Sequence, residues 1–328
     1  MFTRRAFLKS GGFALGSFYA GVNPLFNGME LLREKRKVLV TVFQRGAMDG
    51  LMAVPPLNDP WLKKMRPRLA MFAGRRQGAN ALIDLDGRFG MHPDLAPLER
   101  FYKEGRLAVV HGVGSPNPTR SHILAQERLE EGIADIIQIR DSWTMGKPEK
   151  TYTPTDGVDY PRSPLGDSLK QIAALIKSGV GLEIAFAEST GWDTHVQQGT
   201  ASGTFAQRAR DLSASIAAFW KDMESHQDRV VLMTMTEFGR TVHENGSGGT
   251  DHGRASCLFV LGNDVDGGKV HGTIPELDPD ALQDGRDLPV TTDFRAVFSK
   301  VASKHLAVGR DHMLFPGRSD DRIALMKS

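Results

Sequence analysis

Five stretches of the chain are continuously hydrophobic, without the polar alternation of a strand that has one face in water. They are KVLVTVF (37–43), RLAVVHGVG (106–114), LEIAFAE (182–188), RVVLMTMTEFG (229–239) and ASCLFVLG (255–262). Runs of this length and composition predict strands that are buried on both faces of a sheet.

Between these runs, hydrophobic residues recur every three or four positions, which predicts amphipathic helices. The clearest stripe lies within 201–226 and consists of Phe205, Ala209, Leu212, Ile216, Phe219 and Met223. Further helices are predicted over 92–105, 121–143 and 291–307, and the polar, proline-containing segment 144–163 is predicted to be a long loop. Helices that alternate with buried strands predict an α/β fold with a mostly parallel central sheet and helices on both faces.

Composition and charge narrow the class of protein. The 328 residues are 40% hydrophobic and 24% charged, as in ordinary globular proteins, and no linker or repeat divides them. We therefore expect a single domain over 37–320. The net charge of +2 indicates neither nucleic-acid binding nor membrane adhesion. The single cysteine, Cys257, excludes a disulfide framework within the chain, and its hydrophobic run predicts a buried, inert thiol.

The N-terminus has the character of an export signal. Thr3-Arg4-Arg5-Ala6-Phe7-Leu8-Lys9 is similar to the twin-arginine (Tat) motif, and a short, glycine-rich hydrophobic stretch follows it. This stretch is too short for a membrane-spanning helix. We predict a signal over 1–28, the Tat machinery as partner, and a periplasmic or otherwise exported location. The cleavage site is poorly marked, so the signal is either removed or retained as a membrane anchor.

Polar side chains follow the predicted strands at their carboxyl ends, where α/β proteins bind ligands. Asp49 follows the first run, Ser121 the second, Asp193 and His195 the third, and Glu237 lies at the end of the fourth. A glycine-rich turn, GGTDHGRAS (248–256), precedes the fifth run and carries an acid beside an imidazole. Because this turn comes before its strand, it is expected to fold back to reach the others.

These residue types favour a site for a divalent metal and an anion. Carboxylates and imidazoles suit Zn²⁺ or Mn²⁺. The candidate ligands are Asp49, Asp193, His195, Glu237, Asp251 and His252. Arginines suit phosphate or sulfate, and the candidates are Arg45, Arg120 and Arg240. Ser121, at the start of a predicted helix, is the candidate nucleophile, and His122 is a candidate for proton transfer.

Each candidate also has a purely structural interpretation. The alternatives are a turn at Asp49–Gly50, a helix cap at Ser121, a surface loop at 193–195, a Glu237–Arg240 ion pair and a plain turn at 251–252. The occurrence of so many candidates at strand ends favours a shared site.

The motifs RGAMDGL, TRSH, GWDTH, TEFGRT and GTDHG, in this order behind the export signal, resemble a bacterial family known as domain of unknown function 1501. That family is considered a relative of the alkaline phosphatase and sulfatase superfamily. The resemblance spans about residues 37–317. It implies an alkaline-phosphatase-like fold and a metal-dependent site, with metal ligands at Asp49, Asp193, His195 and His252 and a nucleophile at Ser121. It also implies that Asp251 is either a ligand or an orienting residue behind one.

The sequence departs from the superfamily pattern at Phe238, where a histidine often provides a ligand, and the segment between TRSH and GWDTH is short. Two hypotheses follow. The first is an exported, metal-dependent hydrolase of a phosphate or sulfate ester, with one or two metal ions. The second is a non-catalytic periplasmic binding or assembly protein that retains the fold.

Overall fold

The computed structural model describes residues 36–72, 81–117, 152–308 and 323–327, all within one compact unit, Arg36–Ser328. The signal region and the helix predicted over 121–143 lie outside the described residues, as do Arg120, Ser121 and His122.

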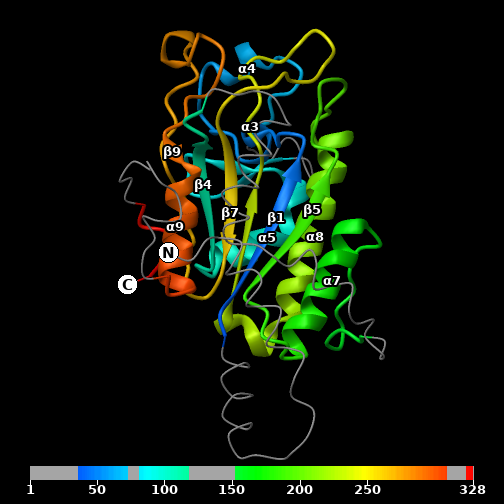
Figure 1. Cartoon of the computed structure of the whole chain (residues 1–328). Coiled ribbons are helices and arrows are strands. Elements are labelled where there is room, and N and C mark those ends of the chain that lie inside the picture. The colour runs from blue at the N-terminus through cyan, green and yellow to red at the C-terminus, as the bar shows by residue number, and fades with distance from the viewer. Residues whose placement is uncertain (1–35, 73–80, 118–151, 309–322, 328) are drawn as a thin grey trace, which may run out of the picture. The chain divides into compact units, whose positions relative to one another are not determined.

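The five hydrophobic runs form the long strands of one seven-stranded sheet (Figure 1). These strands are β1 (Val38–Arg45), β4 (Leu107–Gly114), β5 (Ile184–Thr190), β6 (Val230–Met235) and β7 (Ser256–Leu261). The order is β5-β1-β6-β7-β4-β8, where β8 is Val270–His271, and β9 (Thr292–Asp293) also pairs with β4. β1 is parallel to β5 and β6, and β4 is parallel to β8 and β9. The predicted mostly parallel sheet is confirmed.

β7 is the exception, because it runs antiparallel to both of its neighbours, β6 and β4. Its first residue therefore lies at the same edge of the sheet as the carboxyl ends of the parallel strands. The turn before β7 reaches that edge directly, so the expectation that it must fold back was wrong. The hydrophobic run carries no signal for strand direction, which is why the sequence did not reveal this.

The two faces of the sheet pack against different helices. In β1, Val38, Val40 and Val42 join the hydrophobic cluster that includes side chains of α5 (Ala96–Lys103), α7 (Pro164–Lys177) and α8 (Thr204–Asp222). Leu39 and Phe43, on the opposite side of the strand, pack in the cluster that includes Val297, Phe298 and Val301 of α9 (Phe294–His305). Because both faces are covered, the runs of β1, β4, β6 and β7 have the burial that was predicted. The prediction was wrong for β5 at the end of the sheet, where buried residues alternate with more exposed ones and Phe186 is 38% exposed.

The helices match the predicted stripes, with one addition. All six stripe residues predicted within 201–226 are buried, five of them in α8 and Met223 at its end. The Asp293 side chain caps α9 by accepting a hydrogen bond from the Arg295 amide. The sequence analysis missed α7, although Ser163 caps it and Leu165, Leu169, Ile172 and Ile176 form its buried stripe.

The remaining elements are short. They are α3 (Gly50–Ala53), α4 (Leu62–Met65), β2 (Ile83–Asp84), β3 (Gly90–Met91), and the 3₁₀ turns at Pro93–Leu95, Glu224–Arg229 and Pro279–Ala281. β2 and β3 form a separate two-stranded ladder.

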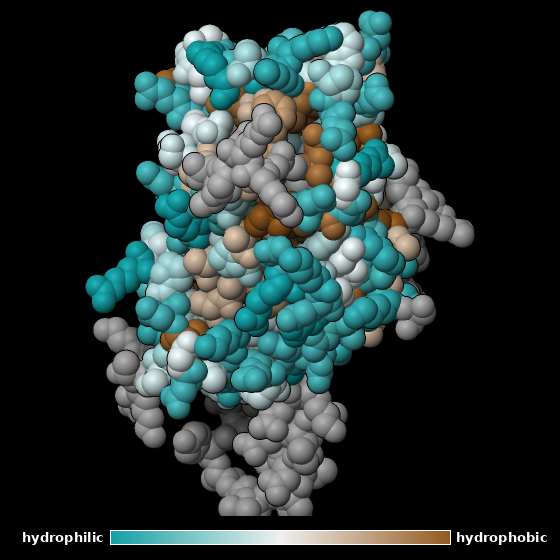
Figure 2. Space-filling view, turned by 180° about the vertical axis from the view of Figure 1, so that it is seen from behind, coloured by the Kyte–Doolittle hydropathy of each residue, from teal (hydrophilic) through white to brown (hydrophobic). Residues whose placement is uncertain are grey.

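The surface is mainly hydrophilic on the face seen from behind in Figure 2, with hydrophobic patches in its middle and upper parts. Among the described residues, the exposed large hydrophobic side chains are Val180, Phe186 and Val196. None of the helices in the described part of the chain is both long and apolar enough to cross a membrane.

Candidate metal site

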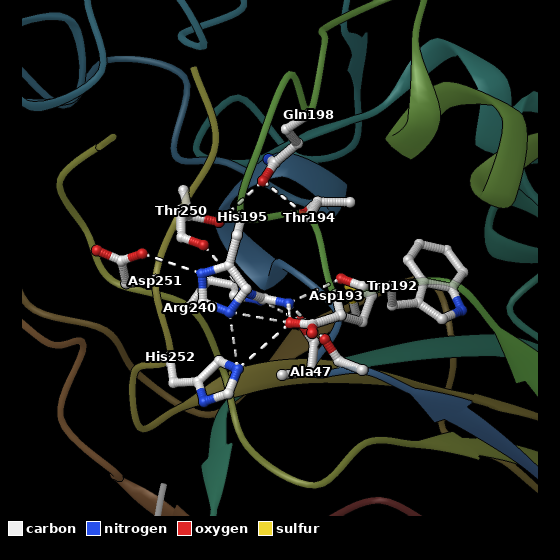
Figure 3. A network of polar contacts seen from close by, with 12 residues as sticks. Ala47, Trp192, Asp193, Thr194, His195, Gln198, Arg240, Thr250, Asp251 and His252 are labelled. Carbon is white, nitrogen blue, oxygen red and sulfur yellow. Dashed lines mark hydrogen bonds and ion pairs between the residues drawn. The ribbon is translucent and has the colours of Figure 1, made fainter. Parts of the chain in front are cut away.

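The loop after β5 presents alternate side chains to opposite sides. Trp192 is buried and its indole N–H donates to the Ser189 hydroxyl, and Thr194 is also buried. Asp193 and His195 point the other way and remain partly exposed (Figure 3). This alternation places both side chains in one site.

The glycine-rich turn before β7 lies against this loop. The Thr250 amide donates to the Thr194 carbonyl at 3.2 Å, and a Cβ added at Gly249 would lie 2.3–2.4 Å from the backbone of Thr194 and His195. Only glycine allows this close approach at position 249. The contact brings Asp251 and His252 beside His195.

Three potential ligand atoms converge where the two loops meet (Figure 3). His195 Nε2 lies 3.0 Å from His252 Nε2 and 3.1 Å from Asp193 Oδ1, and His252 Nε2 lies 3.3 Å from the same Asp193 oxygen. Four tetrahedral ligands at about 2.0–2.1 Å from a zinc ion are separated from one another by about 3.3 Å. The three atoms therefore form a triangle close to one face of a zinc coordination tetrahedron, and these residues fit a metal.

Asp251 fixes the orientation of one imidazole. Its Oδ1 lies 3.0 Å from His195 Nδ1 and accepts a hydrogen bond from the Asn245 side-chain amide. The bonds from Asn245 and His195 hold the pKa of Asp251 below its ordinary value. A carboxylate at Nδ1 places the proton there and leaves the Nε2 lone pair toward the other two ligand atoms. Asp251 is thus positioned behind His195 as an orienting residue.

Arg240 is a buried support for the site and has no free donor directed to a substrate. Its guanidinium donates to the carbonyls of Gly46, Ala47, Trp192 and Thr250 and to Asp193 Oδ1 at 2.6 Å. Burial raises the pKa of Asp193, but the hydrogen bond and charge of Arg240 outweigh it, with smaller contributions from His252 and His195. The net pKa lies below the ordinary value, so Asp193 is held as a carboxylate.

Glu237 clamps the turn that follows β1. Its carboxylate accepts hydrogen bonds from the amides of Gly46 and Ala47, both in the left-handed region at φ 115° and 63°, and from the Thr236 hydroxyl. Glu237 is buried and is not among the three convergent ligands. The structural alternative was an ion pair between Glu237 and Arg240. The structure shows a different arrangement, in which both side chains hold the turn that follows β1.

Asp49 is also buried and is not among the convergent ligands. It caps α3 by accepting from the Leu51 and Met52 amides, and it forms a two-point ion pair with Arg66. Its Oδ2 accepts a further bond from Gln198, whose own carbonyl oxygen accepts from the hydroxyls of Thr194 and Thr250. Figure 3 shows Gln198 between Thr194 and Thr250. Through Gln198, Asp49 therefore supports both the loop after β5 and the turn before β7, here called the ligand loops.

Two more residues that the sequence analysis singled out have structural contacts. Arg45 forms an ion pair with Glu188 on the adjacent strand, and its guanidinium lies over the Phe43 ring. Phe238 packs on the His252 imidazole with ring centroids 4.8 Å apart. Phe238, which takes the place of a ligand in the superfamily pattern, instead holds a predicted ligand in place.

The sequence analysis missed Arg66, Gln198 and Asn245. Asn245 accepts from the Ser247 and Gly249 amides, which shapes the turn, and donates to Asp251. An asparagine followed by Gly-Ser-Gly-Gly is a turn signal that could have been recognised. Arg66 and Gln198 lie in ordinary surroundings along the chain, so no local pattern pointed to them.

Comparisons with known proteins agree with part of the sequence-based resemblance. The model of a family described as "Protein of unknown function (DUF1501)" matches residues 151–313, just under half of the 328 residues. The motifs GWDTH, TEFGRT and GTDHG lie inside the match, and RGAMDGL and TRSH lie outside it. No curated protein matches the chain.

Two solved structures show distant similarity. The C-terminal periplasmic domain of EcEptC from Escherichia coli, in complex with Zn, is 12% identical, with 69% of this chain and 72% of that chain covered and a TM-score of 0.36. Ps i-CgsB in complex with k-i-k-neocarrahexaose is 8% identical, with 82% and 72% covered and a TM-score of 0.33. At these scores neither likeness bears on the function.

Proposed function

We propose that this protein is an exported, metal-dependent hydrolase of a phosphate or sulfate ester. The observation that carries the proposal is the triangle of Asp193 Oδ1, His195 Nε2 and His252 Nε2, with edges of 3.0–3.3 Å. Two imidazoles and a carboxylate are a ligand set that Zn²⁺ and Mn²⁺ accept, and three protein ligands leave a further coordination position open.

The chain's own residues prepare this site for a cation. Asp193 is held as a carboxylate by Arg240, and Asp251 directs the Nε2 lone pair of His195 inward. Three acceptor atoms this close together repel one another unless a cation or a proton lies between them. A bound divalent metal would polarise an ester oxygen and lower the pKa of a hydroxyl nucleophile or a water molecule.

The remaining catalytic roles rest on the sequence. We propose Ser121 as the nucleophile, His122 as a proton donor or acceptor, and Arg120 as a cation near the transferred group. Zn²⁺ or Mn²⁺ is the proposed ion. Apart from Asp251, which orients His195, Asp49 and Glu237 are the further candidate ligands for a second ion. Both of these carboxylates accept hydrogen bonds from protein donors, which favours a one-metal site.

The proposed location is the periplasm or another exported compartment, reached through the Tat machinery, with the signal either removed or retained as an anchor. The Thr3–Lys9 motif supports this proposal. Fusion of residues 1–35 to a reporter that requires Tat export, beside the same fusion with both Arg4 and Arg5 changed to Lys, tests it. Export that survives the double change would contradict the Tat route.

The first experiment is metal analysis of the full-length protein by mass spectrometry, beside His195→Ala and His252→Ala. We expect near-stoichiometric Zn²⁺ or Mn²⁺ in the wild type and its loss in both variants. His243→Ala is a matched control because His243 is exposed and lies in the neighbouring segment. A wild type that stays metal-free after incubation with both ions would refute the metal site.

The second experiment separates hydrolase from binding protein. Metal-loaded protein is assayed with p-nitrophenyl phosphate and p-nitrophenyl sulfate, and Ser121→Ala is compared with wild type. A hydrolase should lose turnover in this variant while it retains its metal. The alternative, a non-catalytic binding or assembly protein, is favoured by the engagement of Asp49 and Glu237 with protein donors. It predicts no turnover in either form with anion binding intact.

A further inference from the structure

Three arginines are less than one-tenth exposed in the described part of the chain, namely Arg66, Arg240 and Arg254. The guanidinium of Arg66 donates to Asp49 and to the carbonyls of Thr241 and Val242. Arg240 is similarly saturated, mostly by carbonyls. Buried guanidinium groups generally need such partners, because an unpaired buried charge is costly.

Arg254 differs from the other two. It is only 8% exposed, yet among the described residues its guanidinium forms neither a hydrogen bond nor an ion pair. Some described side-chain nitrogens and oxygens have neither a hydrogen-bond partner nor contact with solvent, and the nitrogens of Arg254 are not among them. The guanidinium nitrogens therefore retain some contact with solvent, although the residue as a whole is buried.

The backbone of Arg254 lies beside the candidate metal site. Arg254 follows His252 by two residues, and its carbonyl accepts a hydrogen bond from the Gly239 amide. The end of β4 is equally close, since a Cβ added at Gly114 would lie 3.1 Å from the Arg254 carbonyl oxygen. Arg254 thus lies at the edge of the sheet where the ligand loops and the carboxyl end of β4 meet.

Three other nearby arginines are engaged. Arg45 is paired with Glu188, and Arg240 has an acceptor at each of its guanidinium nitrogens. Arg286 donates to the His252 carbonyl and lies within 3.7 Å of Asp287. Arg208, beside Gly191, also has no hydrogen bond or ion pair among the described residues, but it is only half-buried. Arg254 is the buried arginine near these loops that has an unused fork of donors.

We propose that Arg254 binds the tetrahedral oxyanion, the phosphoryl or sulfuryl group, of a ligand at the metal site. This inference rests on the proposed function and adds to it the residue that recognises the anion. A guanidinium fork matches two oxygens of such a group and remains charged at all working pH values. The buried stem fixes the fork in place, so little side-chain entropy is lost when the anion binds.

The test is isothermal titration of inorganic phosphate and of sulfate into metal-loaded, full-length protein at matched ionic strength. Arg254→Gln should weaken anion binding about 10- to 100-fold, as expected for loss of charge-assisted hydrogen bonds, and Arg254→Lys should weaken it less. Arg162→Ala is the matched control, because Arg162 is exposed in the segment before α7. Binding by the Gln variant that equals wild type would overturn the proposal.

Two further readouts keep the outcomes separate. Metal content is measured on the same samples. A protein that binds no metal would count against the proposed function. Anion binding that still depends on Arg254 would uphold this inference. Thermal melts of the wild type in phosphate or sulfate, against chloride at the same ionic strength, serve if the variants do not fold. Stabilisation that saturates at millimolar oxyanion supports the proposal, because the general stabilisation by these anions keeps growing with concentration, and equal melting temperatures overturn it.

Discussion

The ion pair between Asp49 and Arg66 offers a sharp test of how the site is supported. Both side chains are about 1% exposed and are joined by two hydrogen bonds, 2.8 and 3.1 Å long. In Arg66→Met the carboxylate would remain buried without its cation. Removing one partner of a buried pair typically costs about 3–5 kcal/mol of unfolding free energy. Asp49 still has two amide donors and Gln198, so we expect a value of about 3 kcal/mol.

Asp49→Asn tests the other half of the pair. The amide oxygen can still cap α3 and accept from one Arg66 nitrogen, but Arg66 loses its counter-charge and its second hydrogen bond to residue 49. The double variant removes both charges, so its loss of stability should be smaller than the sum of the two single losses by about 1–3 kcal/mol. The assay is urea unfolding in the presence of a chelator, which removes any contribution of bound metal.

A ligand role for Asp49 makes the opposite prediction. If Asp49 binds the metal, Asp49→Asn should leave the stability of the metal-free protein nearly unchanged and should lower the metal content. That pair of results would refute the interpretation of Asp49 as a buried support. Additivity of the two single variants would also contradict it, because it would mean that the two side chains do not act as a pair.

Three further predictions follow from single contacts. Asp251→Asn should weaken zinc affinity about 10- to 100-fold in a competition titration, because it removes the carboxylate that orients His195, and unchanged affinity would contradict this. Gly249→Ala should destabilise the fold by about 1–3 kcal/mol in urea and lower metal content, whereas Gly246→Ala, with no atom near the added Cβ, should be neutral. Burial lowers the pKa of His111 from 6.5 to about 4, so protonation of the unfolded chain should reduce stability progressively as the pH falls from 6.5 to about 4. His111→Gln should flatten this slope, and an equal slope in the two proteins would refute it.

The elements that the sequence predicted best are those whose burial is uniform along their length. The hydrophobic runs of β1 and β4 indicate strands because both of their faces are covered, and the stripe of α8 indicates its buried face. The hydrophobic sequence of β7 does not indicate that this strand is antiparallel to its neighbours. Strand direction is decided by connections and neighbours, and a run of six buried residues reads the same in both directions.

The convergent part of the site was predicted because its residues sit on short motifs with local geometry. Asp193 and His195 alternate with the buried Trp192 and Thr194, and the contact of Gly249 with their loop adds His252. The sequence could not decide whether Asp49 and Glu237 bind a metal or accept hydrogen bonds from the protein. A carboxylate that binds metal and one that accepts amide hydrogen bonds look alike in sequence, because their partners come from distant segments.

The same limit explains the arginines. Arg240 was expected to face an anion, but the carbonyls of Gly46, Ala47, Trp192 and Thr250 surround it. Arg254, beside the ligand loop, attracted no attention in the sequence. An arginine that supports the fold has many acceptors around its guanidinium, and one that is available to a ligand has few. This number is known only from the structure.

The short motifs therefore contain two kinds of residue, and their variants should be distinguishable. In GWDTH the outward positions carry potential ligands and the inward ones anchor the loop, and GTDHG combines Thr250, which bonds to Gln198, with His252. Loss of an outward residue would remove a candidate ligand from a loop that stays folded. Loss of an inward one displaces every ligand on that loop at once, so stability and metal content should fall together.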